Sequence, residues 1–155
     1  MSRTLRKRTM VASIAGLSLA LVGLVGVPAF AATGLSPAPA VDAAGARYFV
    51  DGDATTTTVT GLAANTDYYV GLCANASYLF GIPACAGFQS VTTDAAGSLT
   101  ATVVLQSNGA NTHATAPGQP QTVDCTATNA CAIKVATHGT TKQIVDQSVS
   151  FRVEQ

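Results

Sequence analysis

Apolar and polar residues alternate in two stretches of the chain, the pattern of a β-strand with one buried face. In residues 67–73 we expect the apolar Tyr68, Val70 and Leu72 to face the core. Tyr69, Gly71 and Cys73 then share the opposite face of the same strand. Residues 98–105 alternate in the same way, with Leu99, Ala101, Val103 and Leu105 in phase.

Other β-prone stretches, separated by turn residues, complete an all-β pattern. They are residues 47–50, 55–60, 88–93, 122–125, 131–136 and 148–153. Asp51-Gly52 is a two-residue hairpin signal, so we expect 47–50 to pair with 55–60. Residues 107–119 are rich in Asn, Gly, Thr and Pro and predict a long loop or a weakly held hairpin. No window after residue 31 sustains helical periodicity, so the fold class is a sandwich or barrel.

Residues 1–31 have the three-part pattern of a secretory signal peptide. Four basic residues precede an apolar run over 11–27, and Ala29-Phe30-Ala31 follows Pro28. We therefore expect cleavage between Ala31 and Ala32. The run is long enough for the alternative of an uncleaved membrane anchor. Serines and glycines dilute it, however, and no basic cluster follows it.

After cleavage the chain has one domain and a negative charge. Residues 32–44, spaced by Pro37 and Pro39, predict a flexible or extended lead-in with part of a first edge strand, and 45–155 form the domain. Four of the eight basic residues leave with the signal and no acid does, so the remaining net charge is −4. Such a charge argues against direct contact with nucleic acid or an anionic membrane. We expect a secreted, monomeric protein.

Four cysteines in an exported chain imply two disulfides, for which three pairings are open. We choose Cys73–Cys85 and Cys125–Cys131, because each pair closes a short, hairpin-like segment. A zinc site would require closer spacings, so no metal is expected.

The segments around these cysteines resemble the neocarzinostatin family of secreted actinobacterial apoproteins. The matching blocks are Tyr68–Ala74, Cys85, Phe88–Ser98, Thr122–Cys125 and Cys131, within a resemblance from about Val59 to Phe151. It implies a seven-stranded immunoglobulin-like sandwich with a small two-hairpin subdomain and the disulfide pairing above. It also implies a cleft between them that holds a non-covalent enediyne chromophore. The ligand cuts DNA, and the apoprotein stores and shields it.

Several residues are candidates for that cleft. A glycine in mid-strand lets a ligand approach the backbone closely, so Gly71 suggests a cleft floor. Phe88 matches the family's chromophore-contacting phenylalanine, and the apolar run over 78–83 predicts a ligand wall or a contact surface. Asn75 stands where family members can carry a large residue. The candidate ligand residues are Tyr69, Gly71, Cys73, Asn75, Tyr78, Leu79, Phe80, Cys85 and Phe88.

No catalytic constellation is visible, so we do not expect an enzyme or a required cofactor. His113 and His138 are isolated in predicted loops, where we expect both to be exposed to solvent. The main hypothesis is a carrier of an apolar, aromatic, enediyne-type molecule. The alternative is a secreted or cell-surface interaction module that has lost the chromophore. Residues 108–121 favour it because they lack the family's ligand-packing aromatics, and Ala132 and Ala136 replace polar positions.

Overall fold

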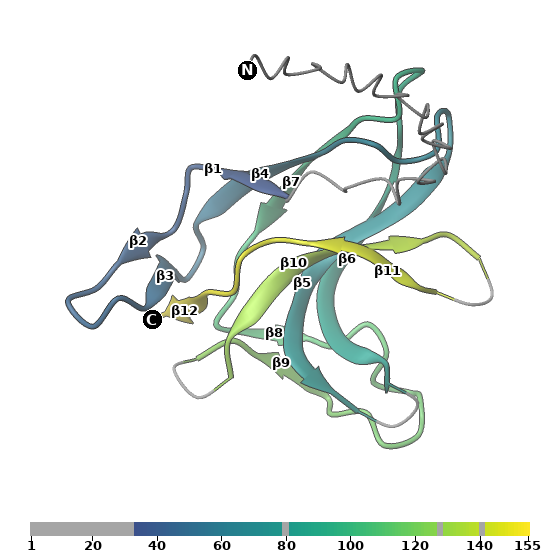
Figure 1. The fold of residues 1–155 in the computed structure, drawn as a ribbon. Coiled ribbons are helices and arrows are strands. Elements are labelled where there is room, and N and C mark those ends of the chain that lie inside the picture. Colours follow the sequence, from purple (N-terminus) through teal and green to yellow (C-terminus); the bar gives the residue numbers. More distant parts are fainter. Residues whose placement is uncertain (1–32, 79–80, 127–128, 140–141) are drawn as a thin grey trace, which may run out of the picture.

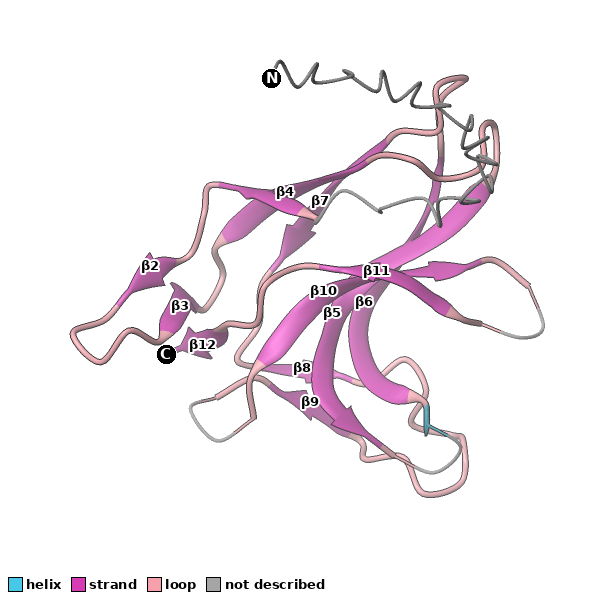
Figure 2. Cartoon of the chain, in the orientation of Figure 1, coloured by secondary structure: helices cyan, strands magenta, loops and turns pink. Residues whose placement is uncertain are grey.

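The computed structural model describes residues 33–78, 81–126, 129–139 and 142–155, whose regular structure is built from β-strands (Figures 1 and 2). The predicted signal, its cleavage point at Ala31 and Ala32, and the candidates Leu79 and Phe80 lie outside the described residues.

Seven strands form the two main sheets, in which every pairing is antiparallel. The first sheet has the order β1 (Gly34–Ser36), β4 (Ala54–Val59), β7 (Leu99–Val104). The second has the order β11 (Ile144–Gln147), β10 (Cys131–Thr137), β5 (Asp67–Ser77), β6 (Pro83–Thr92). The predicted all-β fold with two sheets is confirmed.

The core lies between these sheets because each contributes one apolar face. Val59, Leu99 and Val103 come from the first sheet, and Val70, Leu72, Ile133 and Val135 from the second. All seven of these residues are at most 3% exposed. The alternation predicted for 67–73 and 98–105 is therefore confirmed, since its apolar phase faces the core in both strands.

Two hairpins lie at one end of the sandwich, next to the disulfide of β5 and β6. One is the far part of β5–β6 itself, and the other pairs β8 (Asn108–Ala110) with β9 (Thr122–Asp124). In Figure 1 they lie together at the bottom of the view. The hairpin considered for residues 107–119 is thus present, with a long connection over 111–121.

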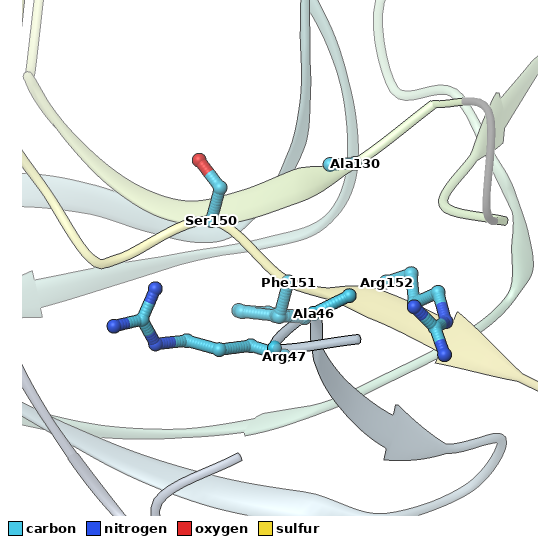
Figure 3. Close-up of a pocket in the computed structure, with 7 residues that line it drawn as sticks. Ala46, Arg47, Ala130, Ser150, Phe151 and Arg152 are labelled. Atoms are coloured by element: carbon cyan, nitrogen blue, oxygen red, sulfur yellow. The ribbon is translucent and has the colours of Figure 1, made fainter. Parts of the chain in front are cut away.

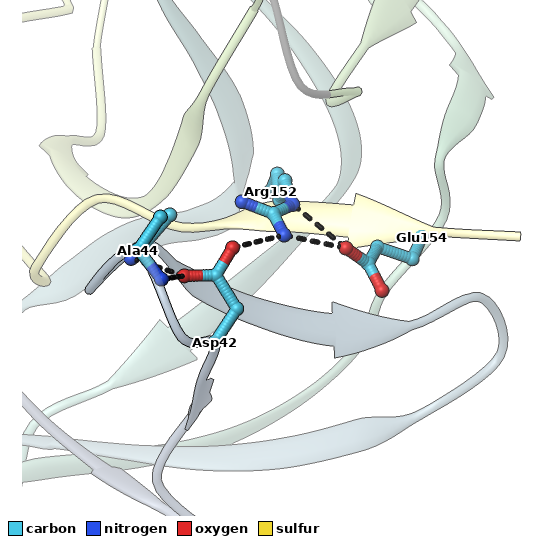
Figure 4. Close-up of polar contacts among 5 residues, drawn as sticks. Asp42, Ala44, Arg152 and Glu154 are labelled. Atoms are coloured by element: carbon cyan, nitrogen blue, oxygen red, sulfur yellow. Dashed lines mark hydrogen bonds and ion pairs between the residues drawn. The ribbon is translucent and has the colours of Figure 1, made fainter.

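A third small sheet joins the two ends of the domain. β3 (Arg47–Val50) lies between β2 (Ala40–Val41) and β12 (Arg152–Glu154). The Arg152 guanidinium contacts Asp42 at 2.8 Å and Glu154 at 2.6 Å (Figure 4). Hydrogen bonds from Arg152 and from the backbone of Ala46 lower the pKa of Asp42. This ion-paired group ties the last strand to the β2–β3 turn.

The predicted pairing of 47–50 with 55–60 is wrong, because β3 and β4 belong to different sheets. The turn between them is held by hydrogen bonds to residues 105 and 107, which follow β7. The Asp51 carboxylate accepts hydrogen bonds from the Ser107 amide at 2.6 Å and hydroxyl at 2.8 Å. The Gly52 amide donates to the Leu105 carbonyl at 2.9 Å. The turn thus passes the chain from one sheet to another instead of closing a hairpin.

Two further segments match the sequence prediction only in part. Residues 33–44 contain the edge strands β1, paired with Thr56–Thr58, and β2, paired with β3, so the expected part of an edge strand is present. β11 was not predicted as a strand. Of the predicted strand 148–153, only the last two residues belong to a strand, β12. Edge strands carry weak signals because only one side of each ladder constrains them.

The alternation of β7 gives a direct test of this packing. Val103 is 3% exposed and Val104 is 59% exposed. Val103→Ala leaves a cavity in the core and should lower the free energy of unfolding by about 2–3 kcal/mol. Val104→Ala, the matched control, should change it by about 0.5 kcal/mol or less. Denaturant unfolding measures both, and equal losses would contradict the burial of this strand.

Candidate functional site

The face of β5 that points away from the core is the candidate site. The register places Ala136 of β10 beside Tyr69, Lys134 beside Gly71, and Ala132 beside Cys73. On the other edge Cys73 pairs with Cys85 of β6, and the two form one disulfide. Mostly small residues thus line the middle of this face. The second predicted disulfide, Cys125–Cys131, is also present.

Gly71 is required where it stands because the Phe88 ring occupies the space of its missing side chain. A Cβ at residue 71 would lie 2.8 Å from Phe88 Cδ1 and 3.2 Å from the Ala86 carbonyl oxygen. The ring therefore lies directly against the backbone of β5. This contact explains the glycine by close packing, as a glycine within a strand often requires.

Four rings form a continuous row on this face, which we call the aromatic row: Tyr69, Phe88, His113 and His138. Tyr69 and Phe88 are tilted at 5.8 Å between centroids, and Phe88 and His113 meet edge to face at 5.4 Å. His138 stacks on Tyr69 at 4.4 Å. Lys142 Nζ lies 4.8 Å from the centroid of the Tyr69 ring. Such pairs favour flat aromatic partners.

Asn111 holds the 111–121 loop against β6 and so positions His113. This side chain is 6% exposed, and its Oδ1 accepts hydrogen bonds from the amides of Cys85 at 3.1 Å and His113 at 3.0 Å. Its Nδ2 donates to the Pro120 carbonyl at 2.7 Å. The Thr112 amide donates to the Cys85 carbonyl at 2.8 Å. The loop is therefore fastened next to the disulfide, with His113 against Phe88.

The His113 imidazole lies in an environment that disfavours its charged form. Burial lowers its pKa from the ordinary 6.5, and the positive charge of Lys142 lowers it further. Its Nδ1 atom is buried and has no hydrogen-bond partner among the described residues. A buried polar atom without a partner is uncommon in proteins and calls for an explanation. The neutral ring therefore offers an unused donor or acceptor at the edge of the aromatic row.

The structure brings together only part of the predicted site. Tyr69, Gly71, Cys73, Cys85 and Phe88 lie on or next to this face. Tyr78 is half-buried against the core instead. Asn75 lies six residues along β5 from Tyr69, and its side-chain amide donates a hydrogen bond to the Ser150 hydroxyl at 2.8 Å. These two side chains are engaged within the protein.

Sequence reasoning missed the two histidines and the two lysines of this face. The expectation that both histidines are simply solvated is wrong for His113, which is half-buried, whereas the exposed His138 stacks on Tyr69. Lys134 is only 7% exposed. Residues 113, 134, 138 and 142 carry no shared local pattern. The tertiary pairing of β5, β6 and β10 brings them together.

A concavity lies between the β2–β3 turn and the start of β10. Its volume is about 240 Å³, and Figure 3 shows Arg47 and Arg152 on either side of Phe151 within it. Two of its three polar side chains already have partners: Arg152 is paired with Asp42 and Glu154, and Ser150 accepts the bond from Asn75. We therefore assign it a structural role.

Two kinds of site are absent from the part of the chain that the structure describes. There, no three His, Cys, Asp or Glu side chains are grouped so that they could hold a metal ion. Nor do these residues include a helix with the length and apolarity needed to span a membrane.

The contact between Gly71 and Phe88 can be tested by adding one methyl group. Gly71→Ala should displace the Phe88 ring and lower the free energy of unfolding by about 1–3 kcal/mol, as overpacking typically does. Gly34→Ala is the control, because a Cβ there meets nothing within 4 Å. Denaturant unfolding and the aromatic NMR signals of Phe88 and His113 report the result. Unchanged stability and unchanged ring signals in Gly71→Ala would contradict the packing described.

Comparison with known proteins identifies the family of this chain. A model of the neocarzinostatin family matches residues 31–151. The structure of macromomycin is similar over 74% of this chain and 96% of its own, with 27% identity and a TM-score of 0.51. The solution structure of apokedarcidin covers 76% and 96%, with 25% identity and a TM-score of 0.43. No curated protein matches. The resemblance seen in the sequence is confirmed, and the chain belongs to the neocarzinostatin family.

Proposed function

We propose that this protein is a secreted carrier that binds and shields a small apolar, aromatic molecule of the enediyne type. The observation that carries the proposal is the aromatic row on the face of β5 away from the core, where Gly71 leaves the backbone open to Phe88. Membership of the neocarzinostatin family supports it, since proteins of that family carry non-covalent chromophores. Antimicrobial and DNA-damaging activity would then belong to the ligand.

The aromatic row suits a flat ligand for a physical reason. Phe88 and His113 are held in place by Gly71 and Asn111, so these rings need little further ordering when a ligand binds. Preorganised side chains give up less conformational entropy, and offset or edge-to-face ring contacts add to the area buried. The imidazole of His113 also supplies an aromatic group from 108–121, the segment that favoured the alternative of a lost ligand.

The remaining parts of the proposal concern location and partners. Residues 1–31 would direct export and be removed before Ala32, and two disulfides suit an oxidising compartment. The net charge of −4 after residue 31 disfavours direct binding to DNA. Family members are carriers rather than enzymes, and we propose no catalytic role. The carrier would act as a monomer.

Native mass spectrometry of the protein secreted by its own host tests the carrier function. We expect a mass above that of residues 32–155 with two disulfides, and release of an absorbing, DNA-damaging compound on organic extraction. Phe88→Ala should reduce the bound fraction strongly because it removes the centre of the aromatic row. Val104→Ala, an exposed site on the other sheet, should retain it.

An unloaded protein and a clean extract, with no thermal stabilisation by polycyclic aromatic compounds, would contradict the carrier function. That result would favour the interaction module that keeps the sandwich without a ligand.

A further inference from the structure

Lys134 is a buried cation in the middle of the face that carries the aromatic row. It is 7% exposed, and the register places it beside Gly71 on β5 and Gln147 on β11. Its Nζ donates one hydrogen bond, to the Ala74 carbonyl at 3.1 Å. A protonated amine has three donors, so two remain without an acceptor among the residues that the structure describes. Lys134 forms no ion pair within the described residues.

Small apolar residues lie beside this amine on its own strand, and Gln147 of β11 is its polar neighbour in the register. The neighbours of Lys134 along β10 on the same face are Ala132 and Ala136, and the Cys73–Cys85 disulfide lies alongside. Asp67, which points the same way from the start of β5, is exposed and accepts a hydrogen bond from the Thr92 hydroxyl at 2.5 Å. Burial lowers the pKa of Lys134, because a charged amine is less stable away from water.

A buried, uncompensated cation is costly for the folded protein, so its presence calls for a partner. Two of the four basic residues after residue 31, Lys134 and Lys142, lie on this face, although residues 32–155 together have a net charge of −4. The Phe88 ring lies over Gly71, and Lys134 bonds to the carbonyl of Ala74. Gly71 and Ala74 are three residues apart along β5, a distance of roughly 10 Å. A flat, fused-ring molecule spans that length.

We propose that the Lys134 amine is the polar anchor of the site and that the ligand is a planar aromatic acid. Its carboxylate, or an equivalent anionic oxygen, accepts the free hydrogen bonds of Nζ while its rings lie against Phe88 and Tyr69. This inference rests on the proposed carrier function and deepens it, because it adds a negative group to an otherwise apolar ligand.

Two fluorescent probes of matched shape test the anchor in the purified, disulfide-bonded protein. Anthracene-2-carboxylate carries the anionic group, and 2-anthracenemethanol is its neutral counterpart. At neutral pH the acid should bind about tenfold or more tightly than the alcohol, as expected for a charge-assisted hydrogen bond. Lys134→Met should remove that preference, so that the two probes bind with similar affinity. Arg47→Met, which removes an exposed cation elsewhere, should keep it.

The outcomes separate this inference from the function on which it rests. Binding of both probes with equal affinity by the unmodified protein would overturn the anchor while supporting an aromatic carrier. A preference for the acid that persists in Lys134→Met but disappears in Arg47→Met would also overturn it. Binding of neither probe would contradict both proposals. The comparison of the two probes in the unmodified protein stands even if Lys134→Met fails to fold.

Discussion

Strand β5 is hydrogen-bonded on both edges, to β6 and to β10, so each of its side chains must point to one of two faces. One face, with Val70 and Leu72, is buried against the opposite sheet. Moving the strand by one residue would exchange the two faces and place a tyrosine and a glycine in the core. Core packing therefore fixes which residues remain for binding, and the candidate site depends on that single register.

The candidate site combines this fixed strand with a loop from a distant part of the chain. Asn111 and Thr112 fasten the loop to the backbone of Cys85, which the disulfide connects to β5. His113 thereby reaches Phe88, while His138 and Lys142 contact the Tyr69 ring. The sandwich thus supplies a rigid floor, and two connections supply the remaining rings and charge. Binding groups on loops held by a rigid scaffold are common in β-sandwich proteins.

The sequence was sufficient for those features that depend on local pattern. The alternation around Val70 and Val103, both disulfides and the family were predictable, because strand periodicity and cysteine spacing are local signals. The partner of β3 was not, because Asp51 bonds to Ser107, 56 residues further along the chain. The positions of Gly71 and Phe88 followed from alternation and resemblance. Lys134 and His113 did not, since only the pairing of distant strands buries them.

The central claim is that a ligand binds at the aromatic row and not at the concavity beside Phe151. Intermolecular NOEs between anthracene-2-carboxylate and the protein labelled on its aromatic residues test it most directly. We predict contacts from the probe to the rings of Tyr69, Phe88 and His113. Contacts to Phe151 and none to these three rings, or no intermolecular contacts at saturating probe, would contradict the account.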